Sequence, residues 1–454
     1  MQLQTELAAL VADAQRVSVS ESVLDQHGQD LSYHDHQRPD AVVYATSRAE
    51  VVAVLRWANE HRVPVVPFGA GTSIEGHVIP ERGGISLDLT RMDRVLEIQP
   101  GDLLAVVQPG VLRSALEAAA GEHGLWFPVD PGADASLGGM TATNASGTTT
   151  VRYGGMRTNV IALEAVLADG RVVRAGSRAA KTSAGYDLRA LFIGSEGTLG
   201  VITELTLRLH GIPEAAVAVR AAFPDLEAAC RTAVTLVASG LSVSRCELLD
   251  APTLHAVNAY KGTSYLEAPS LFVEVAGSEA GVAGDLEAVR ELVDAEGCTA
   301  WESERDPTAR ARLWEARHHT LFALVHGSPG KLHKSTDVCV PVSQLPAAVR
   351  EARTRADELG LAASIIAHAG DGNYHVLFML DPDDRGEREA ADRLNDALVE
   401  HALALGGTCT GEHGIGSGKI GYLEREHGDL VPLMREIKRA FDPNGILNPG
   451  KVLR

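Results

Sequence analysis

The chain has 454 residues, a length that predicts two or three domains rather than one compact core. Asp and Glu number 60 against 41 Lys and Arg, which gives a formal net charge of −19. Because such an acidic surface repels nucleic-acid phosphates and anionic lipid, we expect no nucleic-acid partner.

The N-terminal sequence MQLQTELAALVADAQ has no basic region ahead of an apolar run, and no apolar run in the chain approaches the roughly 18 residues of a membrane span. We therefore expect a soluble cytoplasmic protein without a transmembrane segment. The five cysteines lie far apart and include no C-x-x-C pair. This spacing disfavours a disulfide framework, a thiolate zinc site and an iron–sulfur cluster.

In chain order, the first 37 residues predict an N-terminal helical segment. Residues 41–68 predict a strand, a helix and a second strand: AVVYA is a short apolar run, Ser47 and Glu50 form a capping box, and apolar residues then recur at helical spacing before VPVVPFG. This is a βαβ unit. From there to about residue 213, short β-rich runs alternate with glycine-dense loops.

Residues 214 to about 410 alternate between strand-like runs such as SLFVEVAG and helix-like runs such as LEAACRTAVTLVA. This alternation predicts a second, α/β domain with a mostly antiparallel or mixed sheet covered by helices on one face. The tail has too many rigid turn residues in FDPNGILNPGK for a frayed end. The expected parts of the chain are residues 1–37, 38–213, 214–420 and 421–454.

Three glycine-rich loops stand out, at residues 67–77, 130–155 and 192–203. Glycine lets the backbone approach a ligand, and consecutive N–H groups form nests for anions such as a pyrophosphate. A dinucleotide is therefore a candidate ligand, although each loop taken singly is more often a set of turns than a cofactor site. A Rossmann fingerprint fails because Ile74 stands where its third glycine belongs, and a Walker loop fails because His413 stands at its first position and Ile420 follows its lysine.

Taken together and in this order, the loops resemble the FAD-binding domain of the vanillyl-alcohol oxidase and p-cresol methylhydroxylase type, over about residues 38–213. The resemblance implies an α+β fold in which a two-subdomain FAD-binding domain is joined to an α/β cap domain. It also implies FAD held non-covalently, since Thr72 stands where members with covalent flavin carry histidine in this loop. The candidate FAD contacts are Pro67, Gly69, Ala70, Gly71, Thr72, Ser73, Gly76, Pro131, Gly132, Ser136, Gly139, Thr143, Asn144, Gly147, Tyr153, Glu196, Gly197, Gly200, Ile202 and Asn448.

The stretch HAGDGNYH places His368 and His375 on either side of four turn-forming residues. A four-residue hairpin loop, GDGN, would pair the two histidines across two strands and put both imidazoles on one face, where they could share one metal. The alternative is a polar hairpin end with two exposed histidines. GEHG adds Glu412 and His413, and two histidines with one glutamate form a known catalytic metal set.

HAGDGNYH, GEHGIGSGK and FDPNGILNPGK together resemble the C-terminal motifs of the FAD-dependent D-2-hydroxyacid dehydrogenases, so the resemblance covers nearly the whole chain. It implies that His368, His375 and Glu412 bind a divalent metal and that His413 is the catalytic base. Around Arg317 and Lys334 the chain is similar to the segments that supply a substrate-binding arginine and lysine. Asn373 either reaches the substrate or accepts the left-handed turn conformation that Asn tolerates.

The implied reaction is oxidation of a D-2-hydroxyacid, with D-lactate to pyruvate as the leading case, by metal-assisted hydride transfer to FAD. The metal is Zn, Mn or Fe. Electrons would leave to quinone, a cytochrome or an electron-transfer flavoprotein, and the protein could then lie at the inner membrane. Glycolate and D-2-hydroxyglutarate are the alternative substrates, and a non-catalytic flavin relay subunit is the alternative of another class. The sequence leaves the oligomeric state open, and a homodimer is one candidate.

Overall fold

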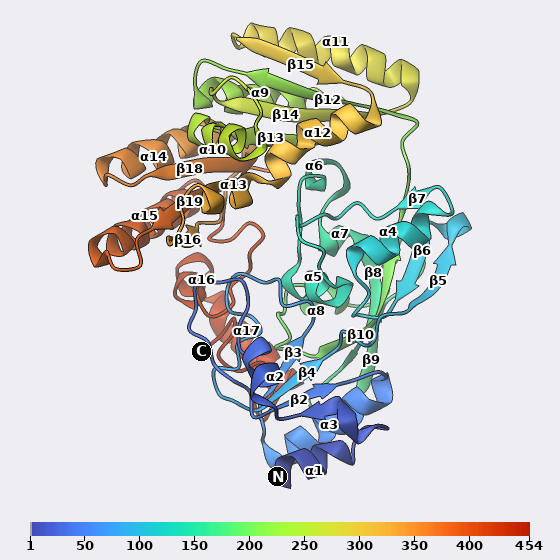
Figure 1. Ribbon diagram of the computed structural model, residues 1–454. Coiled ribbons are helices and arrows are strands. Elements are labelled where there is room, and N and C mark those ends of the chain that lie inside the picture. The colour runs from blue at the N-terminus through green and yellow to red at the C-terminus, as the bar shows by residue number, and fades with distance from the viewer. Residues whose placement is uncertain (1) are drawn as a thin grey trace. The chain divides into compact units, whose positions relative to one another are not determined.

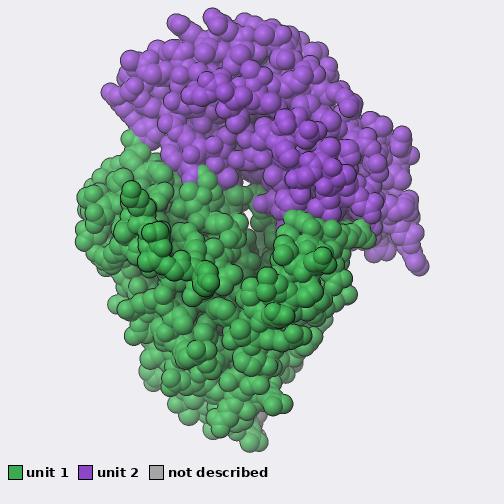
Figure 2. Space-filling view, turned by 180° about the vertical axis from the view of Figure 1, so that it is seen from behind, with its two compact units in different colours: residues 1–146, 154–212, 412–454 green, residues 147–153, 213–411 purple. Residues whose placement is uncertain are grey.

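The computed structural model describes residues 2–454 and divides them between two units, coloured separately in Figure 2. The first unit comprises the residues up to 146, 154–212 and 412–454. The second comprises 147–153 and 213–411. The second unit resumes at residue 213, and the chain returns to the first unit for its C-terminal segment. Two features were not expected: the return begins at residue 412 rather than 421, and residues 147–153 belong to the second unit.

The N-terminal part of unit 1 holds a four-stranded sheet in the order β1-β2-β4-β3. Strands β2 and β3 both run parallel to β4, and α3 connects β2 to β3. This confirms the predicted βαβ unit, and Ser47 caps α3 by accepting the N–H of Glu50. The Glu50 carboxylate bonds Arg16 and Thr46 rather than closing the capping box. The elements are α1 (Gln2–Ala8), η1 (Ala14–Arg16), β1 (Val17–Ser18), α2 (Glu21–Gln26), β2 (Ala41–Tyr44), α3 (Arg48–His61), β3 (Val65–Phe68) and β4 (Ile85–Asp88).

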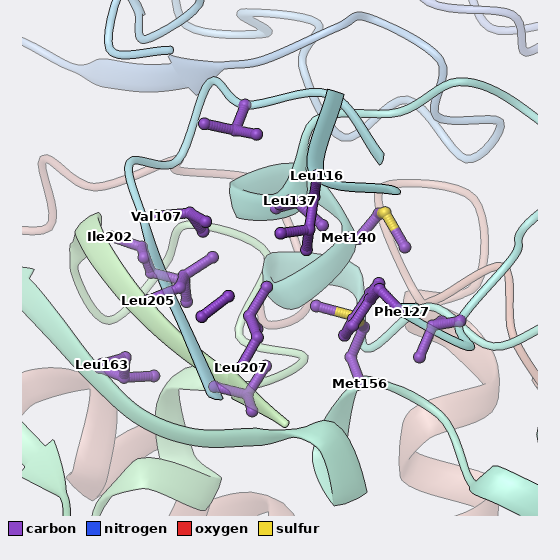
Figure 3. Close-up of a cluster of buried hydrophobic side chains, with 14 of the residues drawn as sticks. Val107, Leu116, Phe127, Leu137, Met140, Met156, Leu163, Ile202, Leu205 and Leu207 are labelled. Carbon is purple, nitrogen blue, oxygen red and sulfur yellow. The ribbon is translucent and has the colours of Figure 1, made fainter. Parts of the chain in front are cut away.

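A second, antiparallel sheet of unit 1 has the order β5-β6-β10-β8-β9. Its inner face packs with α5 and α7 around the apolar cluster drawn in Figure 3, which includes Leu137, Met140, Ile202 and Leu205. Because α5 carries the second glycine-rich loop, this core fixes that loop. The elements are β5 (Val95–Gln99), η2 (Pro100–Asp102), β6 (Leu104–Val107), α4 (Arg113–Gly121), β7 (Leu125–Trp126), α5 (Leu137–Thr143), α7 (Met156–Asn159), β8 (Val160–Val166), β9 (Val172–Gly176), α8 (Arg189–Phe192), β10 (Val201–Arg208), β11 (His210–Gly211), α16 (Ile420–His427) and α17 (Leu430–Phe441).

Unit 2 is built on one antiparallel sheet in the order β15-β12-β14-β13-β18-β19-β16, with β17 also paired to β19. This confirms the predicted α+β class with an antiparallel cap sheet. The strands are β12 (Ala215–Ala222), β13 (Val243–Leu249), β14 (Ser270–Gly277), β15 (Ala300–Glu304), β16 (Leu332–Ser335), β17 (Val338–Cys339), β18 (Ala363–His368) and β19 (Asn373–Leu380).

Helices lie on both faces of this sheet (Figure 1). The longer helices α9, α11, α14 and α15 cover one face, while α10, α12 and α13 bury Leu254, Leu313 and Ala323 against Phe272 and Ile366 on the other. The expectation of cover on a single face was therefore incomplete. The helices are α6 (Thr150–Tyr153), α9 (Leu226–Ala238), α10 (Ala251–Lys261), α11 (Glu279–Ala295), α12 (Pro307–His318), α13 (Thr320–His326), η3 (Val342–Gln344), α14 (Leu345–Glu358) and α15 (Arg385–Ala404).

Candidate functional site

The three glycine-rich loops meet inside unit 1, although they are far apart in the chain. A Cβ added at Gly69 would overlap Ser136 Oγ of the second loop, and one at Gly197 would lie 3.0 Å from Pro67 Cγ of the first. The third loop also joins the second, since Glu196 N–H donates to the Ala142 carbonyl over 2.8 Å. The loops therefore approach one another closely at their glycines.

Asn448 of the C-terminal tail ties this junction together. Its Nδ2 donates to the carbonyls of His77 (3.0 Å) and Glu196 (2.7 Å), so it bridges the first and third loops. Within residues 2–454 its buried Oδ1 has no hydrogen-bond partner. An unmatched polar atom in a glycine-lined junction suits a polar, multi-part ligand such as a dinucleotide. The residues present thus fit FAD.

Of the twenty candidate FAD contacts, eighteen lie in unit 1. The other two, Gly147 and Tyr153, lie in residues 147–153, the short segment that belongs to unit 2. Ser73 Oγ is bonded to Asp30 (2.9 Å), and the side chain of Ile202 is packed in the apolar core of Figure 3. Any contact from Ile202 to a ligand would therefore come from its backbone. The structure brings the three loops together, and the individual FAD contacts stay predictions.

In unit 2 the histidine stretch does form a hairpin, between β18 and β19, but with a different register from the predicted one. His368 pairs with Asn373, and Ile366 pairs with His375. The loop is residues 369–372, because Gly372 takes the left-handed conformation (φ +80°) and frees Asn373 to join the strand. The predicted pairing of His368 with His375 is wrong, and so is the turn role considered for Asn373.

The corrected register still places both imidazoles on one face, because Asn373 and His375 are two residues apart in one strand. Their ring centroids lie 5.7 Å apart, with the planes at 87°. Nδ1 of His368 lies 2.8 Å from Glu247 Oε1, and Nδ1 of His375 lies 3.0 Å from the Thr336 carbonyl. Both partners only accept, so each Nδ1 carries the proton and each Nε2 carries the lone pair that a metal needs.

Glu247, a residue that sequence reasoning missed, bridges this pair to the candidate substrate arginine. Its Oε2 accepts from Arg317 Nε over 2.7 Å, while its Oε1 accepts from His368. The carboxylate is 1% exposed. Burial would raise its pKa, but the interactions with His368 and Arg317 outweigh burial and lower the pKa of Glu247. The structure thus assembles Arg317 and the two histidines on one face.

Asn373 lies on the same face as the histidines. Its Nδ2 donates to Asp337 and to the Val338 carbonyl (2.8 Å each), while its buried Oδ1 has no partner within the described chain. Asp337, also missed, accepts from Thr410 Oγ1 (2.6 Å) and from the N–H of Gly411 (3.0 Å). Asp337 therefore anchors the last residues of unit 2 directly before Glu412.

The structure does not bring Lys334 to this face. Lys334 pairs with Phe378, whose side chain points to the opposite face of the sheet from those of His375 and Leu377. The Lys334 ammonium forms an ion pair with Asp392 of α15. Its neighbours Ser335 and His333 point to the histidine side instead. Burial lowers the pKa of His333 to about 4, so this imidazole is neutral near pH 7.

Glu412 and His413 open the last segment of unit 1. Glu412 accepts from Ser146 Oγ over 3.1 Å, and its Oε1 lies 3.8 Å from His413 Nε2. Nδ1 of His413 lies 4.0 Å from Glu75, whose carboxylate forms a buried ion pair with Lys419 at 3.1 Å. Burial would raise the pKa of Glu75, but Lys419, His34 and His413 together lower it. His413 is thus held in a polar, mostly buried environment.

Gly372→Ala is expected to destabilise the hairpin strongly. A Cβ there would overlap the Val340 carbonyl oxygen in addition to the left-handed strain, which alone costs about 1–3 kcal/mol. Gly360→Ala is the matched control, because Gly360 also has positive φ (+67°) but open space around its Cβ. Chemical denaturation should show the larger loss of unfolding free energy for Gly372→Ala, and equal losses would contradict the packing described.

Two family models match the chain. The model for the FAD binding domain matches residues 39–176, and the model for FAD linked oxidases, C-terminal domain, matches residues 212–452. The first range holds the first two glycine-rich loops, and the second range holds the sheet of unit 2 and most of the C-terminal segment of unit 1.

Curated relatives match over nearly the whole chain. A protein of Danio rerio named probable D-lactate dehydrogenase, mitochondrial, is 43% identical over 96% of this chain and 89% of its own length. D-lactate dehydrogenase [cytochrome], mitochondrial, of Arabidopsis thaliana is 44% identical over 91% and 73%. Glycolate oxidase subunit GlcD of Bacillus subtilis is 35% identical over 91% and 89%.

Solved structures share the fold at low sequence identity. p-Cresol methylhydroxylase with bound substrate has a TM-score of 0.80 at 18% identity, covering 99% of this chain and 96% of that one. 4-Ethylphenol oxidase from Gulosibacter chungangensis has a TM-score of 0.80 at 20% identity, with the same coverage. Both confirm the vanillyl-alcohol oxidase type of fold.

None of the helices in the described part of the chain combines the length and the apolar composition of a membrane span. The expected cytoplasmic location remains a prediction, since several relatives carry mitochondrial names. The two family models, the curated relatives and the converging glycine loops agree on the cofactor and on the kind of enzyme. The chain belongs to the family of FAD-linked oxidases, in its branch of FAD-dependent D-2-hydroxyacid dehydrogenases.

Proposed function

We propose that this enzyme oxidises D-lactate to pyruvate with non-covalently bound FAD and one divalent metal, and passes the electrons to a cytochrome. The observation that supports this most is the single face of unit 2 on which Glu247 joins Arg317 to His368, next to His375. One cation for a carboxylate and two metal-competent imidazoles are the groups that a 2-hydroxyacid requires.

For the metal we propose His368, His375 and Glu412 as ligands, with Zn, Mn or Fe as the ion. The tautomers of both histidines support this set, because each presents Nε2 as the lone-pair nitrogen. Chain connectivity supports the third ligand: Asp337, which neighbours His375 at 3.8 Å, also binds the N–H of Gly411, the residue directly before Glu412.

When bound, FAD supplies the two-electron acceptor and the metal supplies a Lewis acid for the substrate oxygens. Arg317 binds the substrate carboxylate and fixes the orientation of Cα. His413 takes the hydroxyl proton as general base while two electrons and a proton leave Cα as hydride. Asn373 offers its unpaired Oδ1 as a hydrogen-bond acceptor on the histidine face. The organic product is the 2-oxoacid.

The size of the substrate follows from the charges on the histidine face. Beyond His375, strands β16 and β19 present His333, Ser335, Leu377 and Met379, and His333 is neutral near pH 7. These two strands are fully described and offer no lysine or arginine on that face. A second carboxylate, as in 2-hydroxyglutarate, would meet no cationic side chain on the histidine face of these two strands, which favours a small monocarboxylate. The names of the most similar relatives then favour lactate over glycolate.

The electron acceptor is proposed from charge and from the relatives. A formal net charge of −19 favours association with a basic protein, and the Arabidopsis thaliana relative carries the name D-lactate dehydrogenase [cytochrome]. Cytochrome, quinone and electron-transfer flavoprotein can be compared directly by the rate at which each reoxidises reduced enzyme. Rates with a basic cytochrome should fall as salt rises.

Anaerobic bleaching of the flavin by D-lactate, L-lactate, glycolate and D-2-hydroxyglutarate tests the function. We expect fast bleaching by D-lactate and slow bleaching by the other three. Faster bleaching by glycolate or D-2-hydroxyglutarate would reassign the substrate. If none of the 2-hydroxyacids bleaches the flavin, the protein is better explained as a non-catalytic electron-relay subunit.

Arg317→Met and Lys334→Met should separate the two candidate substrate cations. Losing a charged hydrogen bond to the substrate carboxylate costs about 1.5–3 kcal/mol, so Arg317→Met should raise KM for D-lactate by about 10- to 100-fold. Lys334→Met should leave KM within about twofold, because its ammonium pairs with Asp392 on the opposite face. Steady-state kinetics check both, and a large rise in KM for Lys334→Met would contradict the strand register.

A further inference from the structure

We infer that Glu247 is a positioning residue that couples the metal site to the substrate-binding arginine. This deepens the proposed function and rests on it. Glu247 sits in β13 directly opposite His368 of β18, and cross-strand neighbours of this kind have Cβ atoms about 4.5–5.5 Å apart. The sheet itself therefore holds the carboxylate beside the imidazole.

The two oxygens of Glu247 are used separately. Oε1 accepts from His368 Nδ1 (2.8 Å) and Oε2 accepts from Arg317 Nε (2.7 Å). A carboxylate can accept at both oxygens at once, whereas an amide can accept at only one. The glutamate at this position thus satisfies two donors that no neutral side chain of the same shape can satisfy together.

Each bond has a consequence for a ligand. The bond to Nδ1 fixes the His368 tautomer with the lone pair on Nε2 and fixes the plane of the ring. The bond to Nε of Arg317 engages one edge of the guanidinium, so the edge formed by its two terminal nitrogens is the one oriented for a bidentate carboxylate. Through one buried carboxylate, the metal ligand and the substrate anchor are held in a fixed mutual geometry.

Glu247→Gln changes this arrangement without changing its size. If the amide oxygen stays on Arg317, which can only donate, the amide nitrogen faces His368 and favours the tautomer protonated on Nε2. If the amide is flipped, Arg317 loses its acceptor. Because loss of a histidine's carboxylate partner typically weakens metal binding by about 10- to 100-fold, we expect a rise of that size in the dissociation constant.

Glu274→Gln is the matched control. Glu274 lies on the adjacent strand β14, is largely buried, and also accepts from a side chain of α12, through Trp314 Nε1 at 3.1 Å. It makes its ion contacts with Arg245 and Arg310 and not with either histidine. A general loss of stability from removing a buried charge would affect both variants, whereas weaker metal binding should affect only Glu247→Gln.

The experiment is a Zn²⁺ and Mn²⁺ titration of FAD-loaded, metal-stripped protein against a chromophoric chelator, followed by D-lactate kinetics on metal-saturated protein. For Glu247→Gln we expect about 10- to 100-fold weaker metal binding and a raised KM, with flavin content unchanged. Glu274→Gln should match wild type in metal affinity and KM. Wild-type metal affinity in folded Glu247→Gln would overturn the inference.

The experiment distinguishes failure of this inference from failure of the proposed function. A wild-type holoenzyme that binds neither metal or is not bleached by D-lactate would refute the function, whatever the variant does. Should Glu247→Gln fail to fold, Glu247→Asp decides: it keeps both acceptor oxygens but is one methylene too short to reach both partners, so it should weaken metal binding with the same sign. Unchanged affinity in folded Glu247→Asp would then overturn the inference.

Discussion

His375→Ala is expected to lower the rate of flavin reduction by D-lactate by about three orders of magnitude or more, while the purified protein stays yellow. The imidazole is one of two on the metal-competent face, and Lewis-acid stabilisation of developing charge contributes several kcal/mol, where each 1.36 kcal/mol is tenfold in rate. The contacts through which the glycine loops converge, at Gly69, Glu196 and Gly197, lie in unit 1, so flavin content should not change.

Metal analysis and stopped-flow reduction of the same sample check this expectation. His255→Ala is the control. That imidazole belongs to the same unit, but it is 72% exposed and forms an ion pair with Glu267 at the surface. His375→Ala protein that retains stoichiometric metal and near-normal reduction would contradict the metal assignment.

His413→Asn is expected to lower the same rate by about 10²- to 10⁴-fold, the usual contribution of a general base, without loss of metal or FAD. Asparagine preserves polarity but cannot accept the hydroxyl proton. His413 lies in a buried environment beside Glu75 and Lys419, so no bulk water replaces it readily.

Single-turnover reduction of metal-saturated protein measures this effect directly. His427→Asn serves as its control, since His427 lies in α16 of the same unit with its side chain about one-third exposed. A variant of His413 that reduces flavin at the wild-type rate would remove His413 from the reaction, whereas one that loses metal would assign it a ligand role instead.

The fold was largely predictable because its signals are local. Period-2 and helical patterns located the βαβ unit and the antiparallel cap sheet, and glycine density located the three loops. Their meeting point was not predictable, because it depends on tertiary contacts such as that between Gly69 and Ser136 and on Asn448, which comes from the end of the chain.

The histidine hairpin shows how a register error can leave a functional expectation intact. The sequence predicts the four turn-forming residues GDGN as the loop, but Gly372 takes the left-handed conformation at no steric cost and Asn373 pairs with His368. The shift is two residues, and because side chains alternate with period two, both imidazoles stay on one face. A shift of one residue would have separated them.

Lys334 and Glu247 show that sequence motifs alone do not identify every residue of the candidate site. Lys334 lies in a segment that resembles a substrate-binding one, yet its place in β16 turns it toward α15. Glu247 lies in no recognised motif. Its signal was a carboxylate next to Cys246, Leu248 and Leu249 in SRCELL, which places a charge in the apolar half of a strand. A charge in such a position requires partners, and identifying them required the sheet order.

We propose that oxidation of the D-2-hydroxyacid by this enzyme requires both FAD and a divalent metal, which His368, His375 and Glu412 would hold. The most direct test is anaerobic reduction of the flavin by D-lactate, measured in one preparation before metal removal, after removal, and after the metal is restored. We predict fast reduction, loss of at least about three orders of magnitude on removal, and recovery on restoration. Reduction at the same rate by the metal-free, FAD-loaded protein would contradict the claim.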